Sequence, residues 1–205
     1  MAGFTDLTAQ ANLDALITNY PFLALFTAVG TDAGSGFTES AFAGYARVNT
    51  AGLWAAASGS GPSTKSNNAT ISFPLGTTAG ANIIAAGLYS LASGGNLGWW
   101  NWMGSYPWQP ATFSAASPSI ITLPAHGFAN GDSVVMSSEI GSEGTTPPGF
   151  LTGLLTVAGV TTDTFNVGVN APNTGGIMLR KVVPQTVIAN MTVQFTTGQI
   201  VLSLA

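Results

Sequence analysis

The 205-residue chain contains no cysteine, and charged side chains make up only 6% of it. The missing thiols exclude disulfides, thiolate metal sites and cysteine nucleophiles, so stability must come from packing and backbone pairing. An ordinary soluble domain carries roughly 25% charged residues. With a mean hydropathy of +0.37, a chain so poor in ionic groups is expected to cover much of its surface with other protein or with a membrane.

A hydrophobic run long enough to cross a membrane is also missing. The best apolar run, residues 20–29, has about half of the roughly 20 residues that a spanning helix needs. The amino terminus shows no basic region followed by an apolar core, so no secretory signal is expected. We therefore expect no membrane partner, and assembly with other protein explains the composition better.

Positive charge is scarce. Arg47, Lys65, Arg180 and Lys181 are the four basic residues, against eight acidic ones. A surface that binds nucleic acid needs clustered Lys and Arg side chains to displace counterions from the phosphates. No nucleic-acid partner is expected.

Patterns that would indicate catalysis or metal binding are weak. His126 is the only histidine, and its nearest carboxylate in the sequence, Asp132, lies across a predicted turn, so neither a hydrolase triad nor a zinc site is indicated. Asp132, Glu139 and Glu143 form the densest acidic group but lack the regular spacing of a calcium-binding loop. We expect a non-enzymatic protein without cofactor or metal, in which His126 hydrogen-bonds within its own turn.

The amino-terminal segment has the pattern of a short amphipathic helix. Its apolar residues recur mostly at three- and four-residue steps, which predicts a helix over residues 7–18 with Thr5 or Asp6 as its cap. Pro21 is expected to end it, because the residue before a proline avoids the helical region.

Short apolar segments and glycine-rich turns alternate after Pro21. The predicted strands are residues 22–28, 45–49, 53–57, 69–73, 82–91 and 97–108. Many short strands with closely spaced turns are typical of an all-β sandwich or barrel. We predict an all-β fold, with a β-sandwich or jelly-roll-like domain and one short amino-terminal helix. The long loops 30–44 and 58–68 are polar but nearly uncharged, as expected for loops that lie on another subunit.

Four of the five tryptophans lie within the last of these predicted strands. If the strand runs unbroken, Trp100, Trp102, Tyr106 and Trp108 share one face, and Trp99 points to the other. These five aromatic residues are the candidate interface. They could form a subunit interface, a seam within the molecule or a sugar-binding platform, and Pro107 indicates that strand pairing stops or lies at an edge there.

Several turn and strand motifs carry a family resemblance. They lie at residues 25–28, 31–34, 44–48, 66–74, 87–89 and 92–100, and a hairpin at 188–204 closes the pattern. In this order they resemble a family of small tailed-bacteriophage virion proteins described as head-decoration, head-fibre or tail-fibre proteins. The resemblance covers about residues 1–110 and 182–205. It implies an all-β protein with a structural role in the virion.

The chain departs from that family by an insertion. Residues 119–136, 149–153 and 156–167 resemble a small β-barrel module repeated in phage tail and baseplate proteins. Asn130 and Gly131 predict a tight hairpin, and residues 161–163 predict a second turn before Phe165 fills the barrel. We predict two domains: an assembly sandwich made of residues 1–110 and 182–205, and an inserted β-barrel, residues 111–181, that projects outward.

These expectations describe a virion protein located on the outer capsid surface or in the tail. The first interpretation is a capsid-decoration or head-fibre subunit that binds the shell as an oligomer. Its partners would be further copies of itself, with a homotrimer expected, and the major capsid protein or other virion proteins. The alternatives are a tail or baseplate component and a lectin-like receptor-binding module, in which the tryptophans would line an exposed groove.

Overall fold

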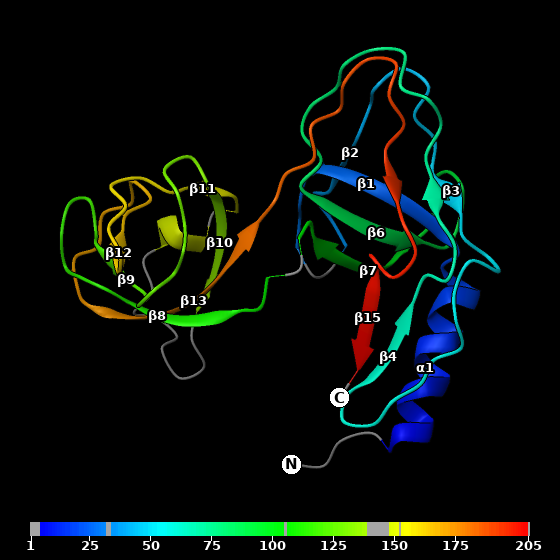
Figure 1. Ribbon diagram of the computed structural model, residues 1–205, viewed down its shortest axis with the longest axis horizontal. Helices are drawn as coiled ribbons and strands as arrows, with labels where there is room; N and C mark the ends of the chain where they lie inside the picture. Colours follow the sequence, from blue (N-terminus) through cyan, green and yellow to red (C-terminus); the bar gives the residue numbers. More distant parts are fainter. Residues whose placement is uncertain (1–4, 32–33, 105, 139–147, 152, 205) are drawn as a thin grey trace. The chain divides into compact units, whose positions relative to one another are not determined.

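A computed structural model describes residues 5–31, 34–104, 106–138, 148–151 and 153–204 of the chain. The chain divides into two compact units, of which the first comprises residues 1–102 and 185–205 and the second residues 103–184. Strands dominate both units, and the first also contains a helix (Figure 1). The predicted all-β class with a short amino-terminal helix is confirmed.

Helix α1 (Asp6–Asn19) begins at the predicted cap. Thr5 Oγ1 accepts a hydrogen bond from the Thr8 amide at 3.4 Å, which satisfies one of the free donors of the first turn. The buried face consists of residues spaced four apart: Ala9, Leu13 and Ile17. The helix ends just before Tyr20 and Pro21, so the prediction for residues 7–18 is confirmed.

Helix α1 packs on the strands β4 (Ser63–Ser66) and β15 (Val201–Leu204) of its own unit (Figure 1). The Nζ of Lys65 on β4 lies 2.6 Å from Asp14 Oδ1 on the helix and 2.6 Å from the Ala55 carbonyl oxygen. Gln10 Nε2 donates to the Gly59 carbonyl at 2.9 Å. The helix is therefore held by polar contacts at its sides in addition to its apolar face.

The main sheet of the first unit is antiparallel and has five strands. They are β1 (Phe22–Ala28), β2 (Thr38–Glu39), β3 (Val48–Asn49), β6 (Ala85–Tyr89) and β7 (Leu97–Trp102). The order is β2-β1-β6-β7, and β3 also pairs with β1. The prediction for residues 22–28 is confirmed, whereas the strands expected at 45–49 and 82–91 are shorter than predicted and the segment 53–57 holds only an isolated bridge at Trp54.

The carboxy-terminal segment does not form the predicted hairpin. Strand β15 pairs with β4, while β14 (Gln194–Phe195) pairs with β5 (Ile71–Ser72). The fully buried Asn67 joins the turns between these strands. Its Nδ2 donates to the Thr196 carbonyl at 2.9 Å, and its Oδ1 accepts from the Ile200 amide at 3.0 Å. The two terminal strands are thus fixed by pairing with distant segments and not with each other.

The second unit is built on one curled sheet of half-barrel form. Its elements are β8 (Gln109–Phe113), β9 (Ile121–Thr122), β10 (Ser133–Ser138), the 3-10 helix η1 (Pro148–Leu151), β11 (Leu155–Thr156), β12 (Thr164–Phe165) and β13 (Gly175–Val182). The strand order is β11-β10-β13-β8-β9-β12. An isolated antiparallel bridge between Ala158 and Asn166 links the chain just beyond the two outermost strands.

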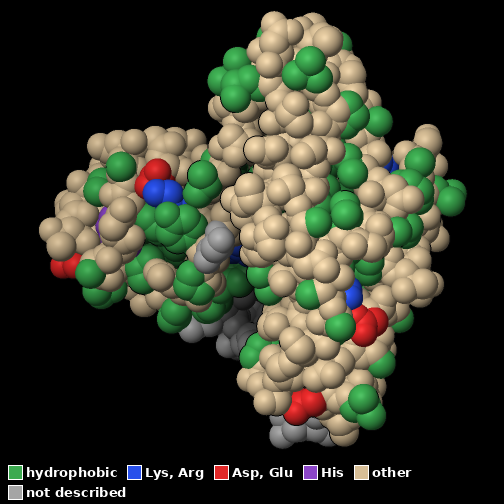
Figure 2. Space-filling model, turned by 45° about the vertical axis from the view of Figure 1, so that its right-hand side comes forward, with side chains coloured by type: hydrophobic (Ala, Val, Ile, Leu, Met, Phe, Trp, Pro, Cys, Tyr) green, Lys and Arg blue, Asp and Glu red, His purple; other side chains and the backbone are tan. Residues whose placement is uncertain are grey.

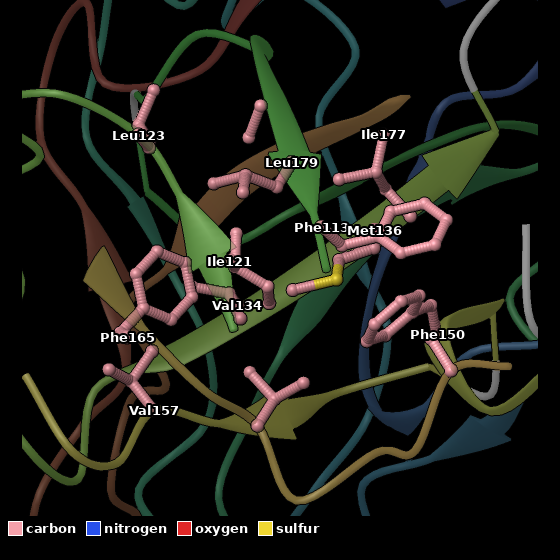
Figure 3. Packing of buried hydrophobic residues seen from close by; sticks show 13 residues of the cluster. Phe113, Ile121, Leu123, Val134, Met136, Phe150, Val157, Phe165, Ile177 and Leu179 are labelled. Atoms are coloured by element: carbon pink, nitrogen blue, oxygen red, sulfur yellow. The ribbon is translucent and has the colours of Figure 1, made fainter. Parts of the chain in front are cut away.

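Aromatic and aliphatic side chains fill the inside of this curled sheet (Figure 3). Phe113 and Phe150 meet edge to face, with ring centroids 5.1 Å apart. Phe165 is fully buried in the same cluster, as expected for the residue after the turn at 161–163. The second unit therefore has a hydrophobic core of its own.

The turn at Asn130 and Gly131 differs from the predicted hairpin. Only Gly131 has a positive φ, +91°, whereas the expected turn type needs positive angles at both residues. The Asp132 amide donates to the Ala129 carbonyl at 3.1 Å, and Asp132 Oδ2 accepts from the Ala129 amide at 2.8 Å. The segment is a tight turn closed by the Asp132 side chain, and it leads into β10.

Candidate functional site

Strand β7 carries three of the candidate aromatic residues. Trp100 and Trp102 point to the same face, where their rings meet edge to face at 5.5 Å. Trp100 also contacts Phe37 at 5.3 Å, and both tryptophans pack partly buried against a cluster made of Ala24, Phe26, Ile84 and Ala85. On this face of the sheet the tryptophans form part of an intramolecular seam.

The opposite face of β7 holds Trp99, which is partly buried and lies opposite Leu88 of β6. The ring of Tyr20 lies against Gly98 on the same strand, so closely that a Cβ on this glycine would be 2.4 Å from Tyr20 Cγ. Gly98 therefore permits the close approach of the tyrosine that follows α1.

Tyr106 and Trp108 do not continue the strand. Strand β7 ends at Trp102, and Gly104 adopts a left-handed backbone with φ of +99°. Tyr106 and Trp108 belong to the second unit, where they are 44% and 41% exposed. The prediction of one unbroken strand over residues 97–108 is wrong, because the glycine turns the chain and Pro107 cannot donate to a ladder.

Arg47 and Glu39 form a partly buried ion pair in the first unit. The guanidinium Nε donates to Glu39 Oε1 at 3.0 Å, Nη1 donates to the Leu91 and Gly94 carbonyls, and the group lies 3.5 Å above the Tyr89 ring. Tyr45 OH donates to Glu39 Oε2 at 3.0 Å. Burial, with a smaller contribution from the Glu39 charge, raises the pKa of Tyr89. No sequence motif links Arg47 and Glu39, so this pair was missed.

Two further ion pairs involve lysines. Lys65 pairs with Asp14 at 2.6 Å, and Lys181 pairs with Asp132 at 2.6 Å. The hydrogen bond from Lys65 lowers the pKa of Asp14. Burial works to raise the pKa of Asp132, but the hydrogen bonds from Lys181 and the Ala129 amide, with the lysine charge, bring it below its ordinary value.

Arg180, the fourth basic residue, is only 7% exposed. Its Nη2 donates to the Gly104 carbonyl at 2.9 Å, and its Cζ lies 6.0 Å from the centre of the Trp108 ring. Burial lowers the pKa of Arg180. All four basic side chains are thus engaged within their own unit, and the face drawn in Figure 2 shows only small charged patches among neutral atoms.

Exposed apolar side chains occur at several places on the first unit. They are Leu7, Leu75, Leu91, Ile188, Met191 and Val201, each at least half exposed. Leu75 and Met191 lie on neighbouring segments, because the Gly76 amide donates to the Met191 carbonyl at 3.2 Å (Figure 1). The surface of this unit therefore combines exposed aliphatic groups with basic groups that are already paired.

The residues considered for catalysis or metal binding are not brought together. His126 Nδ1 accepts from the Phe128 amide at 2.9 Å, within its own turn as predicted. Glu139 and Glu143 lie outside the described residues, and in the described part of the chain no three His, Asp or Glu side chains gather into a possible metal site.

No helix among the described residues has the length and hydrophobicity to span a membrane.

Comparison with known families assigns the class of the protein. A family model described as "Podophage GP4 fiber I protein gp80" matches residues 3–105, just over half of the 205-residue chain. The matched segment contains α1 and β1 to β7, including the tryptophan strand and the Arg47 cluster. No curated protein matches the chain.

The match to a fibre family defines a phage virion structural protein, and the low content of charged residues, 6%, agrees with it. The chain belongs to the family of the podophage GP4 fiber I protein gp80. This membership agrees with the predicted virion location and favours a non-enzymatic role. All but the first three residues of the second unit, and the last strands of the first unit, lie beyond the matched residues.

Proposed function

We propose that the protein is a capsid-decoration or head-fibre subunit that binds the outer surface of the shell as a homo-oligomer. The observation that carries this proposal is the placement of charge. Arg47, Lys65 and Lys181 form ion pairs inside their units, while Leu75, Ile188 and Met191 are exposed. A surface of this kind gains free energy when other protein covers it, at about 25 cal/mol for each Å² of apolar area buried.

The edge of the main sheet supports self-association. Strand β7 pairs with β6 on one side and is the last strand in the sheet order. It carries no charged side chain, and charges are the usual protection of an exposed edge. A closed ring, with a trimer as the first expectation, would cover such edges while leaving no unpaired surface.

Attachment would then rest on many weak apolar and backbone contacts to the major capsid protein. Several copies in one oligomer increase the strength of attachment without any single strong contact, because each further binding event is intramolecular. Low surface charge also means that little desolvation of ions opposes docking.

The second candidate is a tail fibre or tail-associated component. The fibre description of the family favours it, since that description fits a tail as well as a head. The two candidates differ in location on the particle and not in their chemistry.

Electron cryomicroscopy of intact particles, with gold bound to a tag at the carboxy terminus, tests the location. Label on the capsid faces supports decoration, and label confined to the tail supports the second candidate. Native mass spectrometry of the purified chain tests the oligomer. A monomer at high concentration that is absent from particles would overturn both candidates.

A further inference from the structure

The end of β13 in the second unit brings together an ion pair and two aromatic rings. Lys181 Nζ lies 2.6 Å from Asp132 Oδ2, 5.6 Å from the centre of the Tyr106 ring and 6.0 Å from that of Phe128. The side chains of Lys181 and Asp132 remain 19% and 21% exposed. The lysine ammonium therefore lies close to two aromatic rings, and both charged side chains remain within reach of a ligand from solvent.

Tyr106 presents its ring at the surface beside this pair. It is 44% exposed, and its neighbour Val183 is 46% exposed. Both approach Gly104: a Cβ built on this glycine would lie 3.3 Å from Val183 Cγ2 and 3.6 Å from Tyr106 Cδ2. The left-handed turn at Gly104 thus holds an exposed aromatic ring and an aliphatic side chain next to one another.

The ion pair still has free hydrogen-bonding capacity. An ammonium group has three protons, and the described contacts of Lys181 Nζ use one of them, on Asp132. Asp132 Oδ2 accepts from Lys181 and from the Ala129 amide, whereas its Oδ1 has no hydrogen bond to the described residues. A donor and an acceptor therefore lie side by side at the edge of an aromatic surface.

We propose that Tyr106, Lys181 and Asp132 form a binding site for a neutral sugar of a glycan. A pyranose has an apolar C–H face that can lie on the exposed ring, and hydroxyl groups at its edge that each donate and accept hydrogen bonds. Adjacent hydroxyls fit the Lys181 ammonium and the Asp132 carboxylate. The Phe128 ring lies 6.0 Å from the same ammonium.

The charges at the site select against other ligands. An anionic ligand is disfavoured because Asp132 already balances Lys181, and a cation would have to compete with the lysine for the carboxylate. A protein partner would need more contact area than one ring and one ion pair provide, since stable protein interfaces bury roughly 1,200–2,000 Å². A single sugar contact is weak, with a Kd on the order of 1 mM, and several copies of the chain would strengthen it.

The test uses the full chain and does not depend on where the protein lies in the virion. Saturation-transfer NMR with methyl glycosides of glucose, galactose, mannose and N-acetylglucosamine identifies the sugar that binds. A glycan array then tests larger glycans that contain this sugar. Tyr106→Ala is expected to weaken binding at least tenfold, while Tyr106→Phe retains it because the ring remains. Asp132→Asn is expected to weaken binding by a similar factor.

Leu154→Ala is the matched control, since Leu154 is 37% exposed in the same unit. It should bind as the unchanged chain does, and equal melting temperatures exclude misfolding of the variants. The proposal is overturned if no glycoside or array glycan binds, or if Tyr106→Ala binds as tightly as the unchanged chain.

Discussion

Lys65 is 6% exposed, and its ammonium joins Asp14 of α1 to the Ala55 carbonyl. Arg47 is likewise enclosed by Glu39, two backbone carbonyls and the Tyr89 ring. In a chain with so few ionic groups, these side chains fix one element against another and contribute little to the outer surface. These contacts could not be read from the sequence, because no local motif links Arg47 to Glu39, and Asp14, Leu91 and Gly94 lie more than 40 residues from their basic partners.

At the residue scale, Asp14→Asn should loosen the docking of α1 in a pH-dependent way. The folded-state pKa of Asp14 lies below its ordinary value of 3.8, so its carboxylate contributes stability above that pH and loses the contribution as the pH falls through the folded-state pKa. Asp14 is half exposed, so we expect about 0.5–1 kcal/mol at pH 6.

Hydrogen exchange of the α1 amides measures this effect. Protection in the variant should be about two- to fivefold lower than in the unchanged chain at pH 6, and the difference should be smaller at pH 3. Asp163→Asn, a change in the second unit, serves as the control and should leave α1 protection unchanged. An identical difference at both pH values would contradict the assignment.

At the scale of single elements, β12 and its turn close the core of the second unit. Phe165 on β12 is fully buried, and its ring packs against Phe128 at 5.3 Å and His126 at 5.0 Å. The sequence predicted this placement because a turn precedes a lone large aromatic. It did not predict the cluster of rings, which comes from two segments, the turn with His126 and Phe128 and the strand β12.

Phe165→Ala should destabilise the second unit by about 3–5 kcal/mol, because the removed ring leaves a cavity in a packed core. Differential scanning calorimetry should show the melting transition of this unit lowered by more than about 10 °C and that of the first unit unchanged. Ile120→Ala, at a 40% exposed position, should change stability by less than about 0.5 kcal/mol. A common shift of both transitions would show that the units do not melt separately.

At the scale of the whole molecule, the second unit starts and ends at neighbouring points. The Val183 amide donates to the Met103 carbonyl at 3.1 Å. In the first unit, Trp102 pairs with Ala85 and Gln185 bridges to Ile83, two residues along the same segment. Adjacent ends are the feature that lets a domain be inserted without disturbing its host.

Replacing residues 103–184 with a short Gly-Ser linker should therefore leave the first unit folded. Circular dichroism and calorimetry should show one cooperative transition within a few degrees of the first-unit transition of the full chain. The shortened protein should also still associate with particles if the first unit carries attachment. An unfolded or aggregated product would contradict the independence of the two units.

The tryptophan strand shows which side-chain positions a local sequence pattern can predict and which it cannot. Alternation correctly put Trp100 and Trp102 on one face, because side chains along a strand point to opposite sides in turn. The same rule failed for Tyr106 and Trp108, because it assumes an unbroken strand and Gly104 turns the chain. The prediction for the carboxy-terminal strands was wrong for a related reason: local sequence suggests a hairpin, but β15 pairs with β4 and β14 with β5, which are distant in the sequence.

By itself, the amino-acid sequence determined the all-β class, the capped helix at the start and the scarcity of ionic groups. These properties follow from composition and from short-range spacing, which each segment carries wherever it lies. Tertiary structure alone decided which strands pair, which carboxylate each basic residue meets, and how Tyr106 comes to lie beside Lys181 and Asp132. Most of these contacts join residues far apart in the chain, and their geometry exists only once the backbone has folded.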